Sequence, residues 1–364
     1  MPHGGISIAA IGDLMPGPPG LFPGGAPVSE GLGRVAELLG GAGVAVGNID
    51  SVLSDRGYPR EKLITLRREP AVAQDIAKLG FDVISVANNH GTDYGEIGLF
   101  DTLEALEGAG VRAVGGGKTL AQATAPVIVE RDGWRIGVTA WTACLPTGAA
   151  AAPDRPGLAP LHVHTSYEVN PLLLMEEPAT VPTVRSRVDE ADFDAAGAVL
   201  ARLRDEADFV VVLVHWGGGL SEGLAEYQRP LGHALIDAGA DVVVGAHPHR
   251  VLGIERYAGK AILYSGGTLV DQMDRTIVPA ELRPILDMVS PDSFVATFDV
   301  APDGSYGLRV APVTVDGDGV PMPAEGEAFD RIAERLVRLS AELGTEVRTG
   351  EGELVVELGS AVVA

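Results

Sequence analysis

The stretch VVVGAHPHR, residues 242–250, joins an apolar run to two histidines spaced two residues apart. A short apolar run of this kind is typical of a strand that is covered on both faces. Pro248 has no amide hydrogen and ends strand pairing, which places His247 and His249 on a loop at the strand's carboxyl end. In layered α/β folds, ligands bind at that edge of the sheet. We therefore interpret this stretch as a buried strand that delivers two histidines to a site.

Strand and helix patterns alternate through most of the chain around this stretch. Runs rich in Val, Ile and Ala alternate with helical segments, several of which end in glycine. The predicted strands lie in 6–12, 44–50, 81–90, 125–133, 135–143, 208–217, 241–249 and 261–268. The predicted helices lie in 31–43, 69–80, 95–110, 192–207 and 226–240. This order predicts an α/β fold with mostly parallel strands.

Two stretches depart from the alternation. Residues 145–190 are rich in Ala, Pro and Gly with little periodicity, which is typical of a long functional or disordered loop. Residues 294–323 have the pattern of a hairpin around an Asp-Gly turn, and an amphipathic helix and a short strand follow. We expect a single domain over 1–364, with an irregular cleft insertion at 145–190 and a C-terminal hairpin and helix extension at 294–364.

The charge and cysteine content exclude several classes of function. Fifty acidic residues against 27 basic ones give a formal net charge of −23, which repels nucleic acid and anionic membranes. Cys144 is the single cysteine, so we expect neither an internal disulfide nor a cysteine zinc cluster. There is no apolar run of about 20 residues, as a membrane span requires, and the N-terminus leads directly into a predicted strand. We therefore expect a cytoplasmic protein without a signal peptide or membrane anchor.

Polar side chains also follow four other predicted strands, at the same edge of the sheet. They are Asp13, Asp50, the Asn88-Asn89-His90 run and His215. Asp and Asn favour turns and helix caps, and a lone His is more often structural than a ligand. Turn chemistry does not explain five strands that all end this way. Mixed Asp, Asn and His donors suit divalent ions such as Mn, Fe or Zn, and a bridging carboxylate can hold two ions about 3.5–4 Å apart.

The ordered motifs resemble a known family. They are Gly-Asp at 12–13, Gly-Asn-x-Asp at 47–50, Asn-Asn-His at 88–90, His-Trp-Gly at 215–217 and Gly-x-His-Pro-His at 245–249. In this order they resemble the CapA-like branch, of poly-gamma-glutamate capsule synthesis type, of the calcineurin-like metallophosphoesterases. The resemblance covers roughly residues 5–270. It implies a four-layer α/β/β/α sandwich with one or two divalent ions (Mn, Fe, Zn, Ca or Mg) at the strand ends.

The resemblance also implies a role for each motif residue. Asp50 would bridge two ions, Asp13 and His249 would bind the first, and the second would be bound by Asn89, His215 and His247. His90 would be the general acid. The chain departs from the pattern at three positions, with Met15 where the superfamily has a ligand His, Asp50 where the branch usually has Glu, and Arg250 where an apolar residue is expected. Because a thioether is a poor ligand for hard ions, the first metal position has lost a donor.

Further residues are predicted to line the cleft. Arg250 can grip a carboxylate or phosphate with its two-pronged guanidinium, and a surface salt bridge is the alternative. Trp216 and Thr268 are predicted as substrate contacts. His162, His164 and Glu222 are candidates for a second acid–base group, and the two histidines are alternatively substrate contacts or plain loop surface.

Three functions fit these residues. The preferred one is inversion of Cα in the C-terminal residue of a ribosomally made, lasso-type peptide precursor, as one CapA-like branch does, with proton transfer by two bases. The expected lack of an anchor favours this branch over exported capsule proteins. The alternative is metal-dependent hydrolysis of a phosphoester, with His90 protonating the leaving group. A third is poly-gamma-glutamate binding or synthesis, which the net charge of −23 disfavours. The substrate is thus a peptide or a small phosphorylated molecule, and the oligomeric state stays open.

Overall fold

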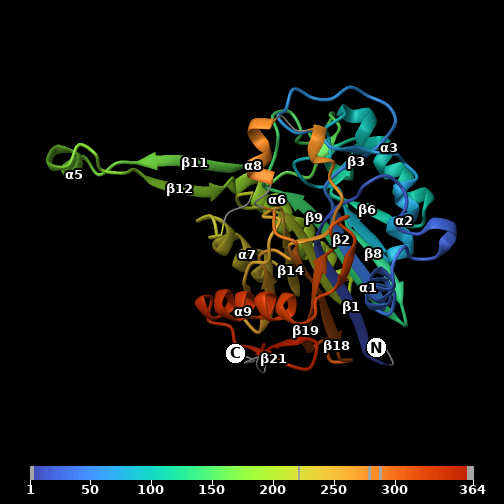
Figure 1. Ribbon diagram of the computed structural model, residues 1–364. Helices are drawn as coiled ribbons and strands as arrows, with labels where there is room; N and C mark the ends of the chain where they lie inside the picture. The colour runs from blue at the N-terminus through green and yellow to red at the C-terminus, as the bar shows by residue number, and fades with distance from the viewer. Residues whose placement is uncertain (1–3, 220–221, 278–279, 287–288, 359–364) are drawn as a thin grey trace.

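The computed structural model describes residues 4–219, 222–277, 280–286 and 289–358, which form a mixed α/β fold built on two large sheets (Figure 1). The first sheet has ten strands. Eight of them follow the order β21 (Val347–Thr349), β22 (Leu354–Val356), β19 (Tyr306–Val315), β18 (Asp292–Val300), β1 (Ile6–Met15), β2 (Val44–Ile49), β5 (Val83–Ser85) and β6 (Arg112–Val114). β17 (Thr268–Asp271) pairs with β1, and β20 (Pro321–Pro323) pairs with β19.

The second sheet has six strands and a parallel centre. Its order is β15 (Ile254–Tyr257), β16 (Lys260–Leu263), β14 (Val242–Ala246), β13 (Phe209–His215), β9 (Trp134–Thr142) and β8 (Val127–Arg131). β9, β13, β14 and β16 are parallel, as β1, β2, β5 and β6 are in the first sheet. The parallel strands therefore bring their carboxyl ends to a common edge within each sheet.

The two sheets share one apolar core, and helices cover their other faces. Ile8 and Val46 of the first sheet lie in the same core cluster as Val138, Leu213 and Val244 of the second. α1 (Glu30–Gly40), α2 (Val72–Leu79) and α3 (Gly95–Gly108) pack on the first sheet, and α6 (Glu190–Glu206) and α7 (Gln228–Asp237) pack on the second. α9 (Glu327–Glu342) adds Ile332 and Leu336 to the shared core. The predicted α/β class and these six helices are confirmed.

The prediction of an irregular loop at 145–190 is wrong for part of this stretch. β11 (Val163–Glu168) and β12 (Thr183–Val188) form a regular antiparallel ladder and carry α5 (Pro171–Glu176), and this arm projects from the body of the molecule (Figure 1). Most side chains of both strands are exposed. Because neither face of the arm is buried, its sequence lacks the apolar alternation by which a strand is normally predicted.

The C-terminal hairpin forms as predicted, but it belongs to the first sheet. β18 and β19 pair around a turn at Gly304, whose φ is 83°. β18 also pairs with β1 from Ile6↔Val300 to Ala10↔Ala296, so the segment expected as an extension completes the sheet beside its central strand. Sequence patterns identify a hairpin from local signals, whereas its neighbour in the sheet is set by a contact across the whole chain.

The remaining elements are short. They are β3 (Val52–Leu53), β4 (Arg67–Arg68), β7 (Gly116–Gly117), β10 (Gly157–Leu158), α4 (Leu120–Ala123) and α8 (Arg283–Leu286), with single 3-10 turns at Pro23–Gly25, Arg275–Ile277 and Ala280–Leu282. Within the described ranges, no helix has the length and apolar character needed to cross a membrane.

Candidate metal centre

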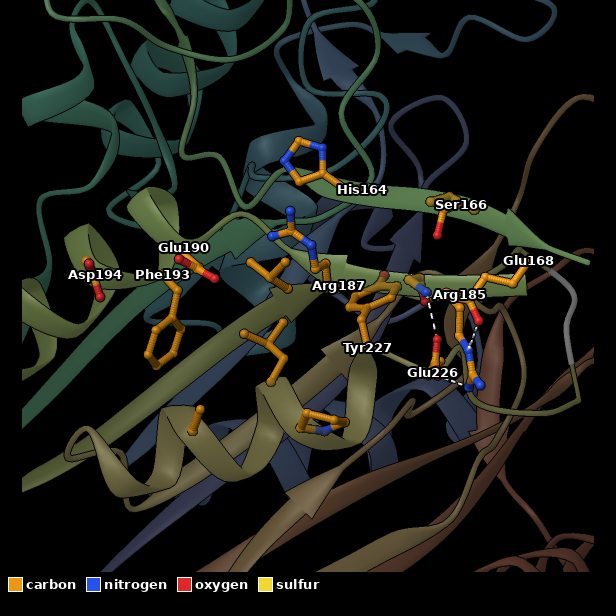
Figure 2. A pocket seen from close by; sticks show the side chains of 16 residues that line it. His164, Ser166, Glu168, Arg185, Arg187, Glu190, Phe193, Asp194, Glu226 and Tyr227 are labelled. Atoms are coloured by element: carbon orange, nitrogen blue, oxygen red, sulfur yellow. Dashed lines mark hydrogen bonds and ion pairs between the residues drawn. The ribbon is translucent and has the colours of Figure 1, made fainter. Parts of the chain in front are cut away.

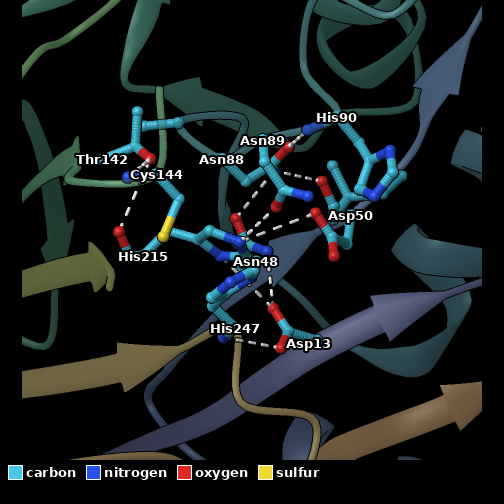
Figure 3. Close-up of polar contacts among 12 residues, drawn as sticks. Asp13, Asn48, Asp50, Asn88, Asn89, His90, Thr142, Cys144, His215 and His247 are labelled. Carbon is cyan, nitrogen blue, oxygen red and sulfur yellow. Dashed lines mark hydrogen bonds and ion pairs between the residues drawn. The ribbon is translucent and has the colours of Figure 1, made fainter. Parts of the chain in front are cut away.

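The carboxyl ends of β1, β2, β13 and β14 meet where the two sheets adjoin. Asp13 of β1 lies beside Asn48 of β2 in the parallel register, and His215 of β13 lies beside Ala246 of β14. The backbone N–H of His247, just past β14, donates to Asp13 Oδ2 at 2.9 Å, which links the two sheets (Figure 3). The strand ends thus bring the predicted polar residues into one buried cluster.

Asp13 stands at the centre of the cluster and is fully buried. Its Oδ1 accepts a hydrogen bond from Asn48 Nδ2 at 2.8 Å, and His249 Nδ1 lies 3.3 Å from its Oδ2. Thr268 Oγ1 also lies 3.2 Å from His249 Nδ1. Thr268 is predicted as a substrate contact. In the structure it is fully buried beside this histidine.

Asp50 is the second buried carboxylate, and it is fully buried. His249 Nε2 lies 3.6 Å from its Oδ2, and His215 Nε2 lies 3.9 Å from its Oδ1. Both distances exceed hydrogen-bond length, and neither Asp50 oxygen has a hydrogen-bond partner among the described residues. A buried carboxylate without hydrogen-bond donors is unfavourable, and His249 and His215 approach Asp50 only at distances longer than a hydrogen bond, so a bound cation would stabilise it.

His215 and His247 present ring nitrogens to the same space. The Nε2 of His215 lies 2.7 Å from the Oδ1 of Asn89, and its Nδ1 lies 3.7 Å from Asp13 Oδ1. In the described part of the chain, the Nδ1 atoms of His215 and His247 are both buried without a hydrogen-bond partner. Two buried nitrogens and two buried oxygens therefore lack partners in one cluster, and a bound cation would satisfy such atoms.

The pKa values of these groups follow from burial and from their mutual contacts. Burial raises the pKa of Asp50 to about 6, although the surrounding cationic groups oppose this. Burial also acts to raise the pKa of Asp13, but the hydrogen bond and charge of His249 outweigh it and lower the value. For His249, burial lowers the pKa but the same contact with Asp13 raises it to about 9. The raised pKa favours the protonated form of His249 beside Asp13 when no metal is bound.

Burial lowers the pKa of His247 to about 3 and also lowers that of His215. Both rings are therefore neutral at physiological pH, and a neutral imidazole is the form that binds metals. The loop that carries His247 and His249 is strained, because both have left-handed φ angles, 101° and 50°. Such strain in non-glycine residues is typical of functional sites.

The donor set fits a divalent ion in type. Carboxylate, amide and imidazole donors suit Mn, Fe and Zn, and the four atoms without partners point to a cation site. Among the described residues, however, no group of three or more His, Cys, Asp and Glu side chains is already drawn together as a metal site. The desolvation of the four buried atoms without partners is unfavourable whatever the spacing of these side chains. Asn89, an amide, also lies outside those four residue types.

His90 lies beside the cluster in a network that sequence patterns do not predict. Its Nδ1 lies 2.6 Å from Asp93 Oδ2, and Lys62 Nζ bonds to Asp93 Oδ1 and to the carbonyl of Asn89, both at 2.6 Å. A carboxylate on one ring nitrogen fixes the orientation of a catalytic histidine. In the sequence, only the spacing of Asp93 three residues after His90 could have indicated this network. Lys62 lies on a loop that carries no motif.

Asn88 and Asn48 connect the cluster residues Asp13 and His90 through hydrogen bonds. Asn88 Nδ2 donates to Asn48 Oδ1 at 3.0 Å and to the carbonyl of Ile49 at 2.6 Å, while Asn88 Oδ1 accepts from the N–H of His90 (Figure 3). Of the Asn88-Asn89 pair, the first fixes the loop and the second faces His215.

Five predicted site residues lie outside the cluster, and three of them are Trp216, His162 and His164. Trp216 is fully buried, donates from its indole nitrogen to the carbonyl of Tyr264 at 3.0 Å and stacks on the Tyr264 ring, so it packs the core instead of contacting a substrate. His162 and His164 stand at the base of the arm, paired with Asp192 at 2.6 Å and with Asp189 at 2.9 Å.

His164 lines a cavity of about 860 Å³ between the arm, α6 and α7 (Figure 2). Tyr227, Arg187 and Glu226 line the same cavity. None of the predicted metal ligands lines it, so this cavity is separate from the buried cluster.

Arg250 points away from the cluster into a groove beside α9. Its guanidinium Nη1 lies 3.3 Å from Glu222 Oε1, and Arg335 of α9 lies 3.5 Å from the same oxygen. Glu222 and Arg250, predicted as an acid–base group and a carboxylate clamp, are therefore paired with one another. The groove adjoins the cluster through the backbone, because Arg250 directly follows His249.

Comparison with known proteins defines the family. Residues 7–273, most of the chain, match the family described as bacterial capsule synthesis protein PGA_cap. The chain belongs to this family. The predicted resemblance to the CapA-like branch is thereby confirmed; the narrower lasso-peptide assignment is not tested by this match.

This PGA_cap family member matches only part of the length of two curated relatives. An uncharacterized protein, y4sH, of Sinorhizobium fredii (strain NBRC 101917 / NGR234) is 29% identical over 304 residues, which cover 71% of this chain and 65% of that protein. Capsule biosynthesis protein CapA of Bacillus anthracis is 28% identical over 263 residues, covering 72% and 54%. The chain thus spans between about half and two thirds of these relatives. A solved hypothetical protein from Thermus thermophilus, at 18% identity and a TM-score of 0.41 over 87% of this chain and 96% of that one, is too distant to support any inference.

Proposed function

We propose that this PGA_cap family member is a divalent-metal-dependent enzyme with the four-layer α/β/β/α sandwich of the calcineurin-like metallophosphoesterases. One observation carries the proposal: both carboxylate oxygens of Asp50 are buried at the strand ends without a partner in the described chain. Such a carboxylate is strongly unfavourable unless a cation binds there. Its neighbours are the imidazoles of His215 and His249, and imidazole is a common ligand of divalent transition-metal ions.

Six residues would hold the ion or ions. Asp13 lies near both His249 and His215, and each of these histidines approaches one oxygen of Asp50. Asn89 contacts His215, and His247 lies beside His215. A bound divalent ion would supply positive charge to a substrate carboxylate or phosphate. Because His249 holds a proton that an ion must displace, metal binding is expected to release protons.

His90 is the residue placed to move a proton. Asp93 orients its ring through Nδ1, which leaves Nε2 available to give or take a proton. Lys62 holds Asp93 and the carbonyl of Asn89 together, so it positions the acid–base group relative to a metal ligand. The proposed reaction is inversion of Cα in the C-terminal residue of a lasso-type peptide precursor, with His90 acting on one face of that carbon.

A specific observation favours a second candidate, hydrolysis of a phosphoester. Inversion needs acid–base groups on both faces of Cα, but the three residues predicted for the second face pair with other groups: His162 with Asp192, His164 with Asp189 and Glu222 with Arg250. Hydrolysis needs one acid for the leaving group, which His90 provides.

Deuterium exchange distinguishes the two reactions. Short peptides that differ in their C-terminal residue are incubated in D₂O with Mn²⁺ or with EDTA, and an aryl phosphate is assayed on the same preparation. We expect Mn²⁺-dependent deuterium at Cα together with inversion; deuterium without inversion would mean that His90 acts alone. Phosphate release without exchange would replace epimerisation by hydrolysis. His90→Gln is the matched variant, which is expected to keep its metal and lose either reaction.

A further inference from the structure

A groove of about 510 Å³ lies beside the candidate metal centre, between α9 and the loops that follow β13 and β14. Four arginines line it, Arg250 and, from α9, Arg331, Arg335 and Arg338, together with three acidic residues, Glu222, Asp292 and Glu334. Such a concentration of positive charge is unusual in a chain with a net charge of −23. The overall field of this protein repels anions, so an anion can bind only where cations are gathered locally.

Two of these arginines pair with carboxylates other than Glu222. Arg331 makes a two-pronged contact with the buried carboxylate of Asp292, at 2.8 and 2.6 Å. Arg338 pairs with Glu342 one turn further along α9, at 3.1 Å. Neither contact involves the loop that carries His249.

The other two meet at a single carboxylate oxygen. Arg250 Nη1 and Arg335 Nη1 lie 3.3 and 3.5 Å from Oε1 of Glu222. Both guanidiniums are largely buried and Arg335 is anchored by a 2.7 Å bond from Nε to the carbonyl of Val251, whereas the Glu222 side chain is 72% exposed. The two cations are therefore fixed by the fold, and the carboxylate between them is held at its tip by two long contacts.

We propose that Arg250 and Arg335 form a binding site for an acidic side chain of the substrate, and that Glu222 occupies this site until that side chain displaces it. Because the Glu222 side chain is exposed and its two contacts are 3.3 and 3.5 Å long, another carboxylate can take its place. A guanidinium pair recognises a planar carboxylate through directed hydrogen bonds. The substrate is then a peptide with a carboxylate side chain outside the reacting residue. This role in catalysis rests on the proposed function, but the binding of a carboxylate does not.

The test uses blocked peptides and metal-free protein. The probes are Ac-Gly-Glu-Gly-NH₂ and its Gln counterpart, which lack a terminal carboxylate, and inorganic phosphate, all in EDTA. Thermal unfolding measures binding, because a ligand of the folded state raises Tm with concentration. We expect the Glu peptide to raise Tm and the Gln peptide to have no effect. A stronger response to phosphate than to the Glu peptide would overturn the choice of a carboxylate ligand.

Variants of the occupant and of the site make the test specific. Glu222→Gln is expected to bind the Glu peptide roughly two- to fivefold more tightly, because the competing carboxylate is gone. Arg335→Lys is expected to weaken binding at least about tenfold, because it loses the fork. Arg338→Ala, in the same groove, is the control and should bind as the wild type does. Unchanged or weaker binding in Glu222→Gln would overturn the proposal, and since this side chain is exposed the variant is expected to fold.

The two proposals fail separately. Binding of the Glu peptide in EDTA without any metal-dependent turnover would leave the groove assigned and refute the proposed function. Metal-dependent turnover of the C-terminal peptide substrates, with no difference in Tm between the blocked Glu and Gln peptides, would refute the groove alone.

Discussion

The cluster at the strand ends buries polar side chains, whereas the projecting arm exposes apolar ones. In the cluster, the carboxylate of Asp50 is fully buried without a partner among the described residues. In the arm, Leu172 and Met175 of α5 are 73% and 80% exposed. The cluster is nevertheless fixed by two sheets and their shared core, whereas β11 and β12 pair only with each other in the described structure.

The two regions differ in the packing that holds these side chains in place. Unfavourable burial of Asp50 is tolerated because the surrounding strands are held in place by a large apolar core. The arm has no such core, and an isolated two-stranded hairpin is marginally stable. Substitutions should therefore have large effects on metal binding and stability in the cluster and small ones in the arm.

The largest effect is expected from Asp50→Asn. An amide cannot supply the charge that binds the ion, so the variant should lose metal and at least about 100-fold in activity. In EDTA it should be as stable as the wild type or more stable, because it no longer buries an unpaired charge. Metal content and thermal unfolding with and without Mn²⁺ measure both effects. Asp299→Asn, in an exposed pair with Arg309, is the control; a Mn²⁺ response in Asp50→Asn equal to that of the control would contradict the assignment.

A pair of leucine variants tests the two regions directly. Leu213→Ala opens a cavity in the shared core and should lower the free energy of unfolding by about 2–5 kcal/mol. Leu173→Ala removes a side chain that is 48% exposed in α5 and should change it by less than about 0.5 kcal/mol. Urea unfolding measures both. Equal losses would show that the arm is packed as firmly as the core.

The raised pKa of Asp50 gives the cluster a pH dependence. Burial raises the pKa from its ordinary 3.8 to about 6, so the folded protein binds this proton more tightly than the unfolded chain. The resulting stabilisation is present below pH 3.8 and is lost as the pH rises through about 6. In EDTA, the free energy of unfolding of the wild type relative to Asp50→Asn should fall by on the order of 1–3 kcal/mol between pH 4 and pH 7. A flat difference would mean that Asp50 is not desolvated.

Sequence patterns predict the cluster better than its surroundings. Asp13, Asp50, His215 and His247 lie at or just past the carboxyl ends of parallel strands, which lie at one edge of a sheet whatever the loops do. Lys62 reaches the cluster from a loop, so no periodicity or spacing indicates it.

The features that sequence patterns do not predict share a physical cause. Trp216 follows a predicted ligand, which favours a substrate contact, yet its ring turns into the core against Tyr264. The pairing of β18 with β1 and the contact of Arg335 with Glu222 join residues that are far apart in the chain. Such contacts depend on how whole elements pack, which local sequence patterns do not contain.

The smallest effect is expected from shortening the arm. Thr165 and Ser186 face each other in the ladder, so residues 166–185 can be replaced by an Asn-Gly turn without changing the register. Ser186 remains and keeps the bond from its N–H to Glu226 at 2.7 Å. Arg185 is lost, but its ion pairs are exposed and such pairs contribute at most about 1 kcal/mol. Urea unfolding should therefore show a loss below about 1 kcal/mol and an unchanged response to Mn²⁺. A loss above about 2 kcal/mol would mean that the arm packs against the body in solution, and the contrast with the cluster would no longer hold.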